Sequence, residues 1–453
     1  MNTQLLPART AAPDFDGLHG GIAGDVVAPG DEGWDLARQA WNLAVDQRPA
    51  AVALPESADD VRAIVDFARR YGLKVAPQGT GHNAAALAGE LGDTILLKTQ
   101  RMRGVTIDPE ARTAGAEAGV IWIEVMEAAA EHGLAALAGS SPDVGVVGYT
   151  LGGGLSWLAR MHGIGANQVT AVELVTAGGR FVRADRDNEP DLFWAVRGGG
   201  GAFAVVTAIE FDLFPITEVY AGILWFLVER SVEVLKAWRA WTDALPDEMT
   251  SVGRILQFPP IPEIPEPVRG KSFVVVEAIY AGEKTDGAAL LEPLRALGPA
   301  MDTVATMPIA ELSRLHMDPE EPVPVAGDGG MLADVGDELI EALVELSVGS
   351  PLLTVELRHL GGAVARAKAE HGAVASFEAP YILFAAGFTP LPAAAEAVHA
   401  SVAALRAALA PWEAEHTYMN FAETKRDARN LFTEQAYDPA DVIRSNHPIA
   451  PAQ

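Results

Sequence analysis

The first hundred residues alternate short apolar runs with stretches of helical spacing. Ala51–Leu54 is a continuous apolar run of strand length, and Leu73–Ala76 is a second one. Between them, apolar residues recur at the spacing of one helix face: Val61, Ile64, Val65, Phe67 and Ala68. Ser57 is placed to cap the start of this helix, and Gly72 is placed to end it. The pattern predicts a β-α-β unit with a parallel pair of strands.

The same patterns predict further strands and helices along the rest of the chain. Strands are expected at Thr94–Leu97, Val105–Asp108, Thr113–Ala118, Thr170–Thr176, Phe203–Leu213, Tyr220–Phe226, Phe273–Tyr280, Leu352–Leu357 and Tyr381–Ala386. Helices are expected at Trp34–Ala44, Ile121–Glu131, Leu155–Met161, Val232–Ala244, Leu339–Leu346 and Ala393–Leu405. This mixture predicts the α+β class.

The character of the chain changes near Phe214 and Pro215, which divides the sequence into three parts. Residues 1–214 contain three clusters of glycines, and residues 215–405 alternate β-rich and helical segments without such clusters. Residues 406–453 form a C-terminal segment. We therefore predict a first domain at 1–214, a second, α+β domain at 215–405, and a closing segment at 406–453.

Composition places the chain among ordinary globular proteins. It has 453 residues, of which 49% are hydrophobic and 21% are charged. These fractions exclude disordered, collagen-like and coiled-coil classes. The 33 basic and 61 acidic residues give a net charge of −28, which repels phosphate backbones and anionic lipid head groups. We therefore expect no nucleic-acid partner.

The absence of cysteine excludes disulfides, cysteine-ligated zinc, iron–sulfur clusters and thiol nucleophiles. The ten histidines are scattered, so no metal site is predicted. No uncharged apolar run approaches the length of about 18 residues that a membrane span needs. Met1 to Arg9 also lacks the apolar core of a signal peptide. We expect no membrane span and a cytoplasmic location.

Three glycine clusters, at 79–81, 145–154 and 198–201, carry the candidate chemistry. Glycine lets backbone amides approach a ligand with no Cβ in the way, and inward-facing amides suit a diphosphate. Each cluster alone is better explained by a tight turn between strands, but three in one domain suggest a large cofactor that contains phosphate. His82 follows the first cluster. It is either hydrogen-bonded within its own turn or is a nucleophilic imidazole beside the cofactor.

The segment Gly79 to Ala84 also fits the dinucleotide pattern G-x-G-x-x-G/A after a strand. A true fingerprint opens a long helix and has an acidic residue about 20 positions later. Here Gly89 and Gly92 interrupt the chain, and position 101 is arginine. An NAD-dependent dehydrogenase therefore stays a minor alternative.

The order of these segments resembles the flavin-dependent oxidoreductases of the vanillyl-alcohol-oxidase superfamily, specifically the berberine-bridge-enzyme-like group. The resemblance spans nearly the whole chain. Four blocks carry it: Arg48–Val61, Pro77–Asn83, Val144–Gly154 with Gly163–Asn167, and Asp191–Gly201 with the strand through Val206. The closing segment adds Tyr418–Asn420 and Asn446.

The resemblance implies a PCMH-type FAD-binding domain of two α/β subdomains, with FAD extended between them, and a substrate-binding domain with an antiparallel sheet. His82 matches the histidine that bonds to the flavin C8-methyl carbon. Ser141 stands where some relatives place a second, cysteine linkage, so a single covalent bond is expected. The cofactor contacts implied are Gln78, Gly79, Thr80, Gly81, His82, Asn83, Ser141, Val144, Gly145, Gly148, Tyr149, Gly152, Gly153, Gly154, Asn167, Val206, Asn420 and Asn446. Gln78 departs from the arginine that relatives often have.

The implied reaction is oxidation of an alcohol, sugar, amine or phenolic metabolite by hydride transfer to flavin N5, with oxygen or another acceptor reoxidising the flavin. Tyr418 is the first candidate for the base that removes the substrate proton, and Glu356 is the second. Strand alternation places Glu356 and Arg358 on one face and His359 on the other. A flavin-binding protein without turnover is the alternative outside the enzymes. The sequence leaves the substrate and the oligomeric state open.

Overall fold

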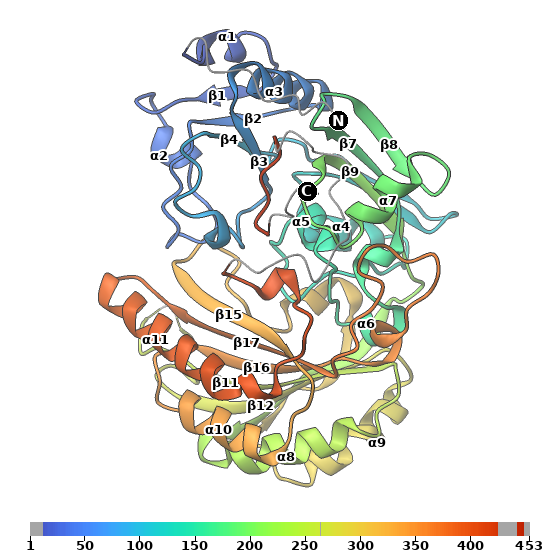
Figure 1. Cartoon of the computed structure of the whole chain (residues 1–453). Helices are drawn as coiled ribbons and strands as arrows, with labels where there is room; N and C mark the ends of the chain where they lie inside the picture. The colour runs from blue at the N-terminus through green and yellow to red at the C-terminus, as the bar shows by residue number, and fades with distance from the viewer. Residues whose placement is uncertain (1–11, 263, 425–441, 448–453) are drawn as a thin grey trace.

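Three β-sheets organise the described residues, 12–262, 264–424 and 442–447, of the computed structural model (Figure 1). Two of the sheets lie in the first 214 residues, and the third lies between residues 218 and 388. The change of character near Phe214 and Pro215 therefore falls between the second and third sheets. The architecture is α+β, as predicted.

The first sheet has the strand order β1-β2-β4-β3. Its strands are β1 (Asp25–Val27), β2 (Ala51–Leu54), β3 (Lys74–Gln78) and β4 (Thr94–Lys98), accompanied by helices α1 (Phe15–His19), α2 (Trp34–Ala37) and α3 (Ala58–Tyr71). β2 and β3 both run parallel to β4, which lies between them. The predicted parallel strands therefore exist, but they are not direct neighbours.

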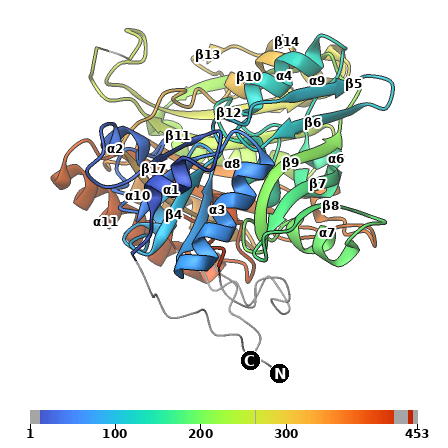
Figure 2. The same cartoon turned by 90° about the horizontal axis from the view of Figure 1, so that it is seen from above.

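Helix α3 begins and ends as its sequence predicts. The Ser57 hydroxyl accepts a hydrogen bond from the amide of Asp60, and Gly72 ends the helix with a left-handed φ of 66°. The helix packs between the first and second sheets (Figure 2). Its Ile64 and Val65 share one apolar cluster with Ile95 of the first sheet and Val205 of the second, so α3 fixes the two sheets relative to each other.

The second sheet is antiparallel throughout, in the order β5-β6-β9-β7-β8. Its strands are β5 (Val105–Asp108), β6 (Thr113–Glu117), β7 (Val169–Thr176), β8 (Phe181–Asp185) and β9 (Ala204–Asp212). The accompanying helices are α4 (Trp122–Ala130), α5 (Val146–Leu151), α6 (Ala159–His162) and α7 (Pro190–Val196). The second and third glycine clusters lie in the connections around α5 and after α7.

The third sheet is antiparallel, in the order β13-β10-β12-β11-β16-β17-β15, with β14 also paired to β10. Its strands are β10 (Glu218–Leu227), β11 (Met249–Gln257), β12 (Ser272–Tyr280), β13 (Met301–Asp302), β14 (Ala305–Pro308), β15 (Val325–Leu332), β16 (Thr354–His359) and β17 (Tyr381–Phe388). Helices α8 (Ser231–Thr242), α9 (Lys284–Arg295), α10 (Asp337–Ser347) and α11 (Pro392–Leu409) cover its lower face in Figure 1.

Both faces of the third sheet are buried, which explains its nearly continuous apolar strands. On β10, Leu224 and Phe226 pack with the helices, whereas Ile223 and Trp225 belong to the cluster that contains the second sheet. Alternate residues of one strand thus serve two different cores. The opposite face of this sheet is therefore held against the first domain.

Several expected elements differ in the structure. The helices predicted at Trp34–Ala44 and Leu155–Met161 are reduced to α2 and α6, which have four residues each. Both segments have apolar residues at helical spacing, but most of each segment forms a loop in the structure. β11, β15 and α9 escaped prediction because polar residues, glycines or Pro293 interrupt their apolar patterns.

Two predictions about the end of the chain have different outcomes. Residues 442–447 return to the first domain, where the amide of Val75 on β3 donates to the carbonyl of Val442 at 2.8 Å. The rest of the predicted closing segment, at 425–441 and 448–453, lies outside the described residues. Helix α11 with the turn that follows it, Pro392–Trp412, is long and apolar enough to cross a membrane by length and composition alone. A single such helix is weak evidence, and the absence of a membrane span stays a prediction.

Candidate functional site

The loop that follows β3 presents His82 in a defined orientation. Thr80 Oγ1 lies 2.7 Å from His82 Nδ1, so the ring does interact within its own turn. The indole of Trp41 stacks on the imidazole, with ring centroids 4.1 Å apart and an interplanar angle of 18°. The amide of Trp41 also donates to the carbonyl of Thr80 at 3.0 Å. Stacking and hydrogen bonding together fix the plane of the His82 ring.

The loop before α5 brings a carboxylate to the other side of this ring. Asp143 Oδ2 lies 3.4 Å from His82 Nε2, and the hydroxyl of Ser141 donates to Asp143 Oδ1 at 2.9 Å. Sequence reasoning singled out Ser141 but missed Asp143 two residues later. Only the tertiary approach of two loops about 60 residues apart in sequence shows the pair.

Glycines of two clusters leave open space in front of the backbone. A Cβ added at Gly148 would meet no atom within 4 Å, and one added at Gly79 or Gly145 would meet its nearest neighbour only at 3.9 Å. A side chain at these positions would enter an open surface and would not enter the core. We call the open backbone at Gly79, Gly145 and Gly148 the cradle, and its contact with a cofactor stays a prediction.

The remaining glycines of the second cluster serve close packing. A Cβ on Gly152 would lie 1.9 Å from Asn420 Oδ1, and one on Gly154 would lie 2.9 Å from the ring of Tyr149. Gly153 has a φ of 116°, which side chains rarely adopt. These three glycines therefore seat the closing segment and Tyr149, which is a different role from lining the cradle.

Buried polar atoms around the cradle fit a large polar cofactor. Asn83 Oδ1, the Tyr149 hydroxyl and Thr207 Oγ1 are buried with no hydrogen-bond partner among the described residues. Buried polar groups are nearly always hydrogen-bonded in complete proteins, so unpartnered ones indicate a missing ligand or water. Thr207 follows Val206 on β9, on the strand that was predicted to lie beside the cofactor.

The closing segment reaches both glycine loops. The Asn446 amide donates to the carbonyl of Asn83 at 2.6 Å, and the Asn83 amide donates to the carbonyl of Met419 at 3.2 Å. The Asn420 amide donates to the carbonyl of Tyr149 at 2.9 Å and to the Tyr418 hydroxyl at 3.0 Å. Asn83, Asn420 and Asn446 therefore tie the end of the chain to the cradle.

Tyr418 lies in an apolar surround with its hydroxyl engaged. The side chain is 2% exposed, and its hydroxyl accepts hydrogen bonds from the amide of Leu155 at 3.1 Å and from Asn420. Burial raises the pKa of Tyr418 above its usual value, and the two donated hydrogen bonds oppose that rise without cancelling it. A base role for Tyr418 therefore requires a further positive charge or hydrogen-bond donor when substrate is bound.

Two other predicted contacts have defined structural partners. The Asn167 amide donates to the carbonyls of Val374 and Ala375 at 3.3 and 3.0 Å, and Asn167 Oδ1 accepts from Gly372 at 2.9 Å. Its polar atoms are thus used to hold the segment 372–375. Gln78 exchanges hydrogen bonds with Gln47. The predicted contacts of both residues with the cofactor stay predictions.

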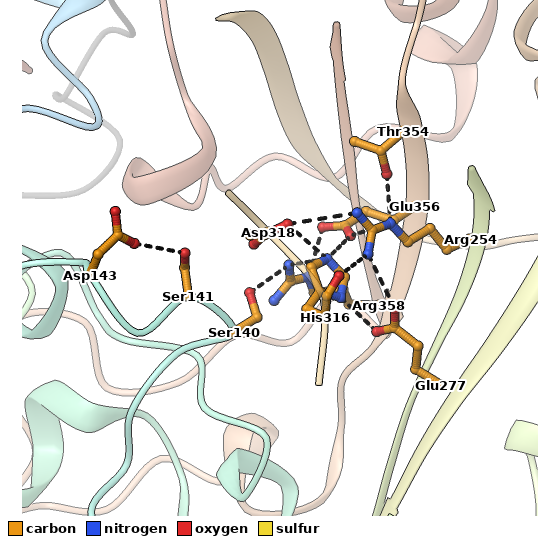
Figure 3. Close-up of polar contacts among 10 residues, drawn as sticks. All are labelled: Ser140, Ser141, Asp143, Arg254, Glu277, His316, Asp318, Thr354, Glu356 and Arg358. Atoms are coloured by element: carbon orange, nitrogen blue, oxygen red, sulfur yellow. Dashed lines mark hydrogen bonds and ion pairs between the residues drawn. The ribbon is translucent and has the colours of Figure 1, made fainter. Parts of the chain in front are cut away.

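Glu356 belongs to a buried ionic cluster on the third sheet (Figure 3). The ionic cluster consists of Arg254, Glu277, His316, Asp318, Glu356 and Arg358. His316 bridges two carboxylates, with Nδ1 2.6 Å from Glu277 and Nε2 2.7 Å from Glu356. Two guanidinium groups and one imidazolium balance three carboxylates, which satisfies the requirement that buried charges be paired.

Glu356 is held as a carboxylate. Burial alone would raise its pKa, but Arg358, 2.8 Å away, and His316 hold the pKa of Glu356 far below its usual range. A carboxylate with such a low pKa is a weak proton acceptor, so Glu356 is poorly suited to act as the base. As alternation predicted, His359 lies on the opposite face, where its ring is 3.2 Å from Arg160.

A cavity between the two domains adjoins these groups. Leu155, Trp157, Arg160, Arg358 and His359 are among the residues that line it. The guanidinium of Arg358 lies 5.7 Å from the ring of Trp157 and 4.9 Å from that of Phe421. The cavity thus combines apolar rings with a cation. No group of three or more acidic, histidine or cysteine side chains in the described part of the chain could hold a metal ion.

Comparison with known proteins bears on the part of the chain that contains these loops. Residues 49–185 match the family model described as FAD binding domain. That range includes both loops that meet at His82 and Asp143, and the open glycines Gly79, Gly145 and Gly148.

Curated relatives are oxidases. The chain is 36% identical over 195 residues to (R)-6-hydroxynicotine oxidase of Paenarthrobacter nicotinovorans, over 43% of this chain and 42% of that protein. It is 34% identical over 229 residues to glucooligosaccharide oxidase of Sarocladium strictum, over 48% of this chain and 45% of that protein. These matches span about half the length of the relatives.

Solved structures share nearly the whole fold. 6-Hydroxy-D-nicotine oxidase from Arthrobacter nicotinovorans has a TM-score of 0.82 at 24% identity and covers 95% of this chain and 98% of that one. BBE-like 1 of Physcomitrella patens has a TM-score of 0.78 at 18% identity, over 90% of this chain and 91% of that one. The overall fold is therefore common to all three proteins.

Proposed function

The chain is a berberine-bridge-enzyme-like flavoprotein with a PCMH-type FAD-binding domain, and from that premise we propose that it is a FAD-dependent oxidoreductase. Its substrate is an alcohol, sugar, amine or phenolic metabolite. FAD is linked covalently through His82 alone, since Ser141 has only a weakly nucleophilic hydroxyl. Bound FAD supplies the acceptor for a hydride from the substrate carbon.

One observation carries this proposal: the fixed imidazole of His82, the open glycine cradle and the buried Tyr418 hydroxyl converge from three distant parts of the chain. The hydrogen bonds of Asn83, Asn420 and Asn446 hold these parts together. A core built for stability alone would leave neither open glycines nor unpartnered buried polar atoms here.

Tyr418 is our first candidate for the group that receives the substrate proton. Its hydroxyl is oriented by Leu155 and Asn420, so it has one fixed position relative to the cradle. The positive charge of Arg358 acts to lower its pKa. Glu356, which is already held as a carboxylate, supports Arg358 electrostatically and is the second candidate.

The relatives divide the substrate proposal into two classes. One curated relative is named for a hydroxynicotine, an amine, and another is named for a glucooligosaccharide. The cavity lined by Trp157, Arg358 and Leu155 joins aromatic and cationic surfaces. This lining does not by itself choose between the two classes, so the proposal keeps both. Oxygen or another acceptor would reoxidise the flavin, and a cytoplasmic location is part of the same proposal.

Spectroscopy separates the proposal from its alternatives. The purified protein should be yellow, and acid precipitation should leave the colour in the pellet. His82→Ala should make all FAD acid-extractable, whereas a yellow pellet from that variant would refute the linkage. A colourless wild-type protein would favour the NAD-dependent alternative.

Substrate bleaching then separates the enzyme from a flavin-binding protein without turnover. Candidate amines, sugars and phenols should be added under argon while flavin absorbance is followed. Tyr418→Phe should slow the bleaching by about 10²-fold or more if the phenol receives the proton. Unchanged bleaching would remove Tyr418 from that role, and a flavin that no substrate class bleaches would favour the binding protein.

A further inference from the structure

Each ring nitrogen of His82 has a polar side-chain atom beside it. Nδ1 lies 2.7 Å from the hydroxyl of Thr80, and Nε2 lies 3.4 Å from Asp143 Oδ2. The side chains of His82 and Asp143 are 23% and 13% exposed, so bulk water screens the pair only in part. Neither Nε2 nor Oδ2 has a hydrogen-bond partner elsewhere in the described chain. The two atoms therefore face each other as the nearest available partners.

The position of Asp143 is itself supported from two sides. Ser141 donates to its other oxygen at 2.9 Å. One residue earlier, Ser140 accepts a hydrogen bond from Arg358 at 3.1 Å, so the ionic cluster of the third sheet holds this loop (Figure 3). The carboxylate is thus fixed before any cofactor binds, as a preorganised catalytic group would be.

This geometry selects the reactive form of the imidazole. A carboxylate beside Nε2 favours the tautomer that carries its proton there, which leaves the lone pair on Nδ1. The Thr80 hydroxyl can then donate a hydrogen bond to the Nδ1 lone pair until that lone pair attacks the flavin C8-methyl carbon. When Nδ1 forms a new bond, the ring gains positive charge, and a neighbouring carboxylate stabilises that charge and accepts the proton.

We propose that Asp143 orients His82 and accepts its Nε2 proton while the covalent bond between His82 and FAD forms. This inference rests on the proposed linkage through His82. The role proposed for Asp143 involves no contact with the substrate. Trp41, stacked on the ring, keeps the imidazole in the plane in which both contacts persist.

The chemical balance requires one oxidant. A bond forms between His82 Nδ1 and the C8-methyl carbon, while one methyl C–H bond and the Nε2–H bond are lost. The proton of Nε2 passes to Asp143 and then to water, and the methyl carbon releases the second proton. The two electrons reduce the flavin ring, and dioxygen takes them with two protons to give hydrogen peroxide.

The test follows covalent incorporation, which needs no substrate turnover. Full-length protein made under riboflavin limitation is mixed with FAD in air, and acid-insoluble flavin is measured against time. Asp143→Asn keeps the shape but removes the charge, and it should slow incorporation by about 10²-fold or more. Reversible FAD binding, measured by filtration, should be retained. Asp187→Asn, the same chemical change on an exposed turn of the same domain, should incorporate FAD at the wild-type rate.

Chemical rescue distinguishes proton acceptance from a merely structural role. Asp143→Ala leaves space for a small carboxylate, so added formate should accelerate its incorporation of FAD, and formate should not accelerate the wild type. Asp143→Glu should recover part of the lost rate.

The outcomes separate this inference from the proposed function. Wild-type protein that never retains flavin after acid would overturn the linkage and this inference together. Wild-type linkage with an equally fast Asp143→Asn variant would overturn the inference alone. It would also be overturned by FAD-binding Asp143→Ala protein that formate does not rescue, or by loss of FAD binding in all three variants.

Discussion

Loss of the proton from His316 should make the stability of the protein fall between neutral and alkaline pH. Burial and Arg254 lower the pKa of His316, but Glu277, Asp318 and Glu356 outweigh them and raise it from 6.5 to about 9. A raised pKa stabilises the folded state fully below the unfolded value of 6.5. That stabilisation is lost as the pH rises through the folded value of about 9.

The size of the effect follows from the shift. Each pKa unit corresponds to about 1.4 kcal/mol, so a rise from 6.5 to about 9 is worth about 3 kcal/mol. The His316 side chain is 2% exposed, so solvent screening does not reduce this figure greatly. Almost all of the loss should fall between pH 6.5 and somewhat above pH 9.

Guanidinium unfolding midpoints across pH 6.5 to 10 provide the assay. The matched pair is His316→Gln, in the ionic cluster, and His132→Gln, at an exposed position. His132→Gln should reproduce the wild-type decline. His316→Gln should be less stable by about 3 to 5 kcal/mol near neutral pH, because it removes the cation that bridges the buried carboxylates of Glu277 and Glu356. Its stability should also decline less steeply with rising pH.

A parallel decline in His316→Gln and wild type would refute the reasoning, whatever their absolute stabilities. The slope is decisive because a purely structural loss would lower stability equally at every pH. An alkaline decline that is present in wild type and absent from His316→Gln would assign the proton to this imidazole.

Two further substitutions test the packing around the site and the core. Gly152→Ala should displace the Asn420 side chain, because Asn420 Oδ1 would lie 1.9 Å from the new Cβ, and it should weaken FAD retention on gel filtration. Gly92→Ala is the control, because its new Cβ would meet no atom within 4 Å and retention of FAD should be unchanged. Equal retention in the two variants would show that Asn420 does not secure the cofactor. Trp238→Ala, at a fully buried position, should lower the free energy of unfolding by about 3 to 5 kcal/mol in chemical denaturation. Trp194→Ala, at a position that is 42% exposed, should lower it far less. Similar losses would contradict the placement of Trp238 in the core between the third sheet and its helices.

Local patterns predicted several regular elements of the first domain, although the helices expected at Trp34–Ala44 and Leu155–Met161 are only four residues long. The run Ala51–Leu54, the stripe of α3 and its caps at Ser57 and Gly72 each depend on residues within one turn or strand. Prediction failed where tertiary contacts override the local pattern. β11 carries Arg254 inside a buried strand, and its charge is tolerated because carboxylates, Thr354 and the carbonyl of His316 surround it.

Some residues of the site could also be predicted from the sequence, and others could not. Glycine spacing and the position of His82 after a strand were visible in the sequence, as were Tyr418, Asn420 and Asn446 through resemblance. Asp143 was not singled out, because nothing in its neighbourhood distinguishes it from other loop acids.

The sequence by itself determined which segments could form strands, helices and open glycine loops, because those properties depend on neighbours a few residues away. Only the tertiary structure decided which charges meet. It placed Asp143 beside His82 and joined Glu356 to His316 and Arg358. The physical reason is that the reactivity of a side chain depends on burial and on charges within a few ångströms, and chain topology, not sequence distance, sets both.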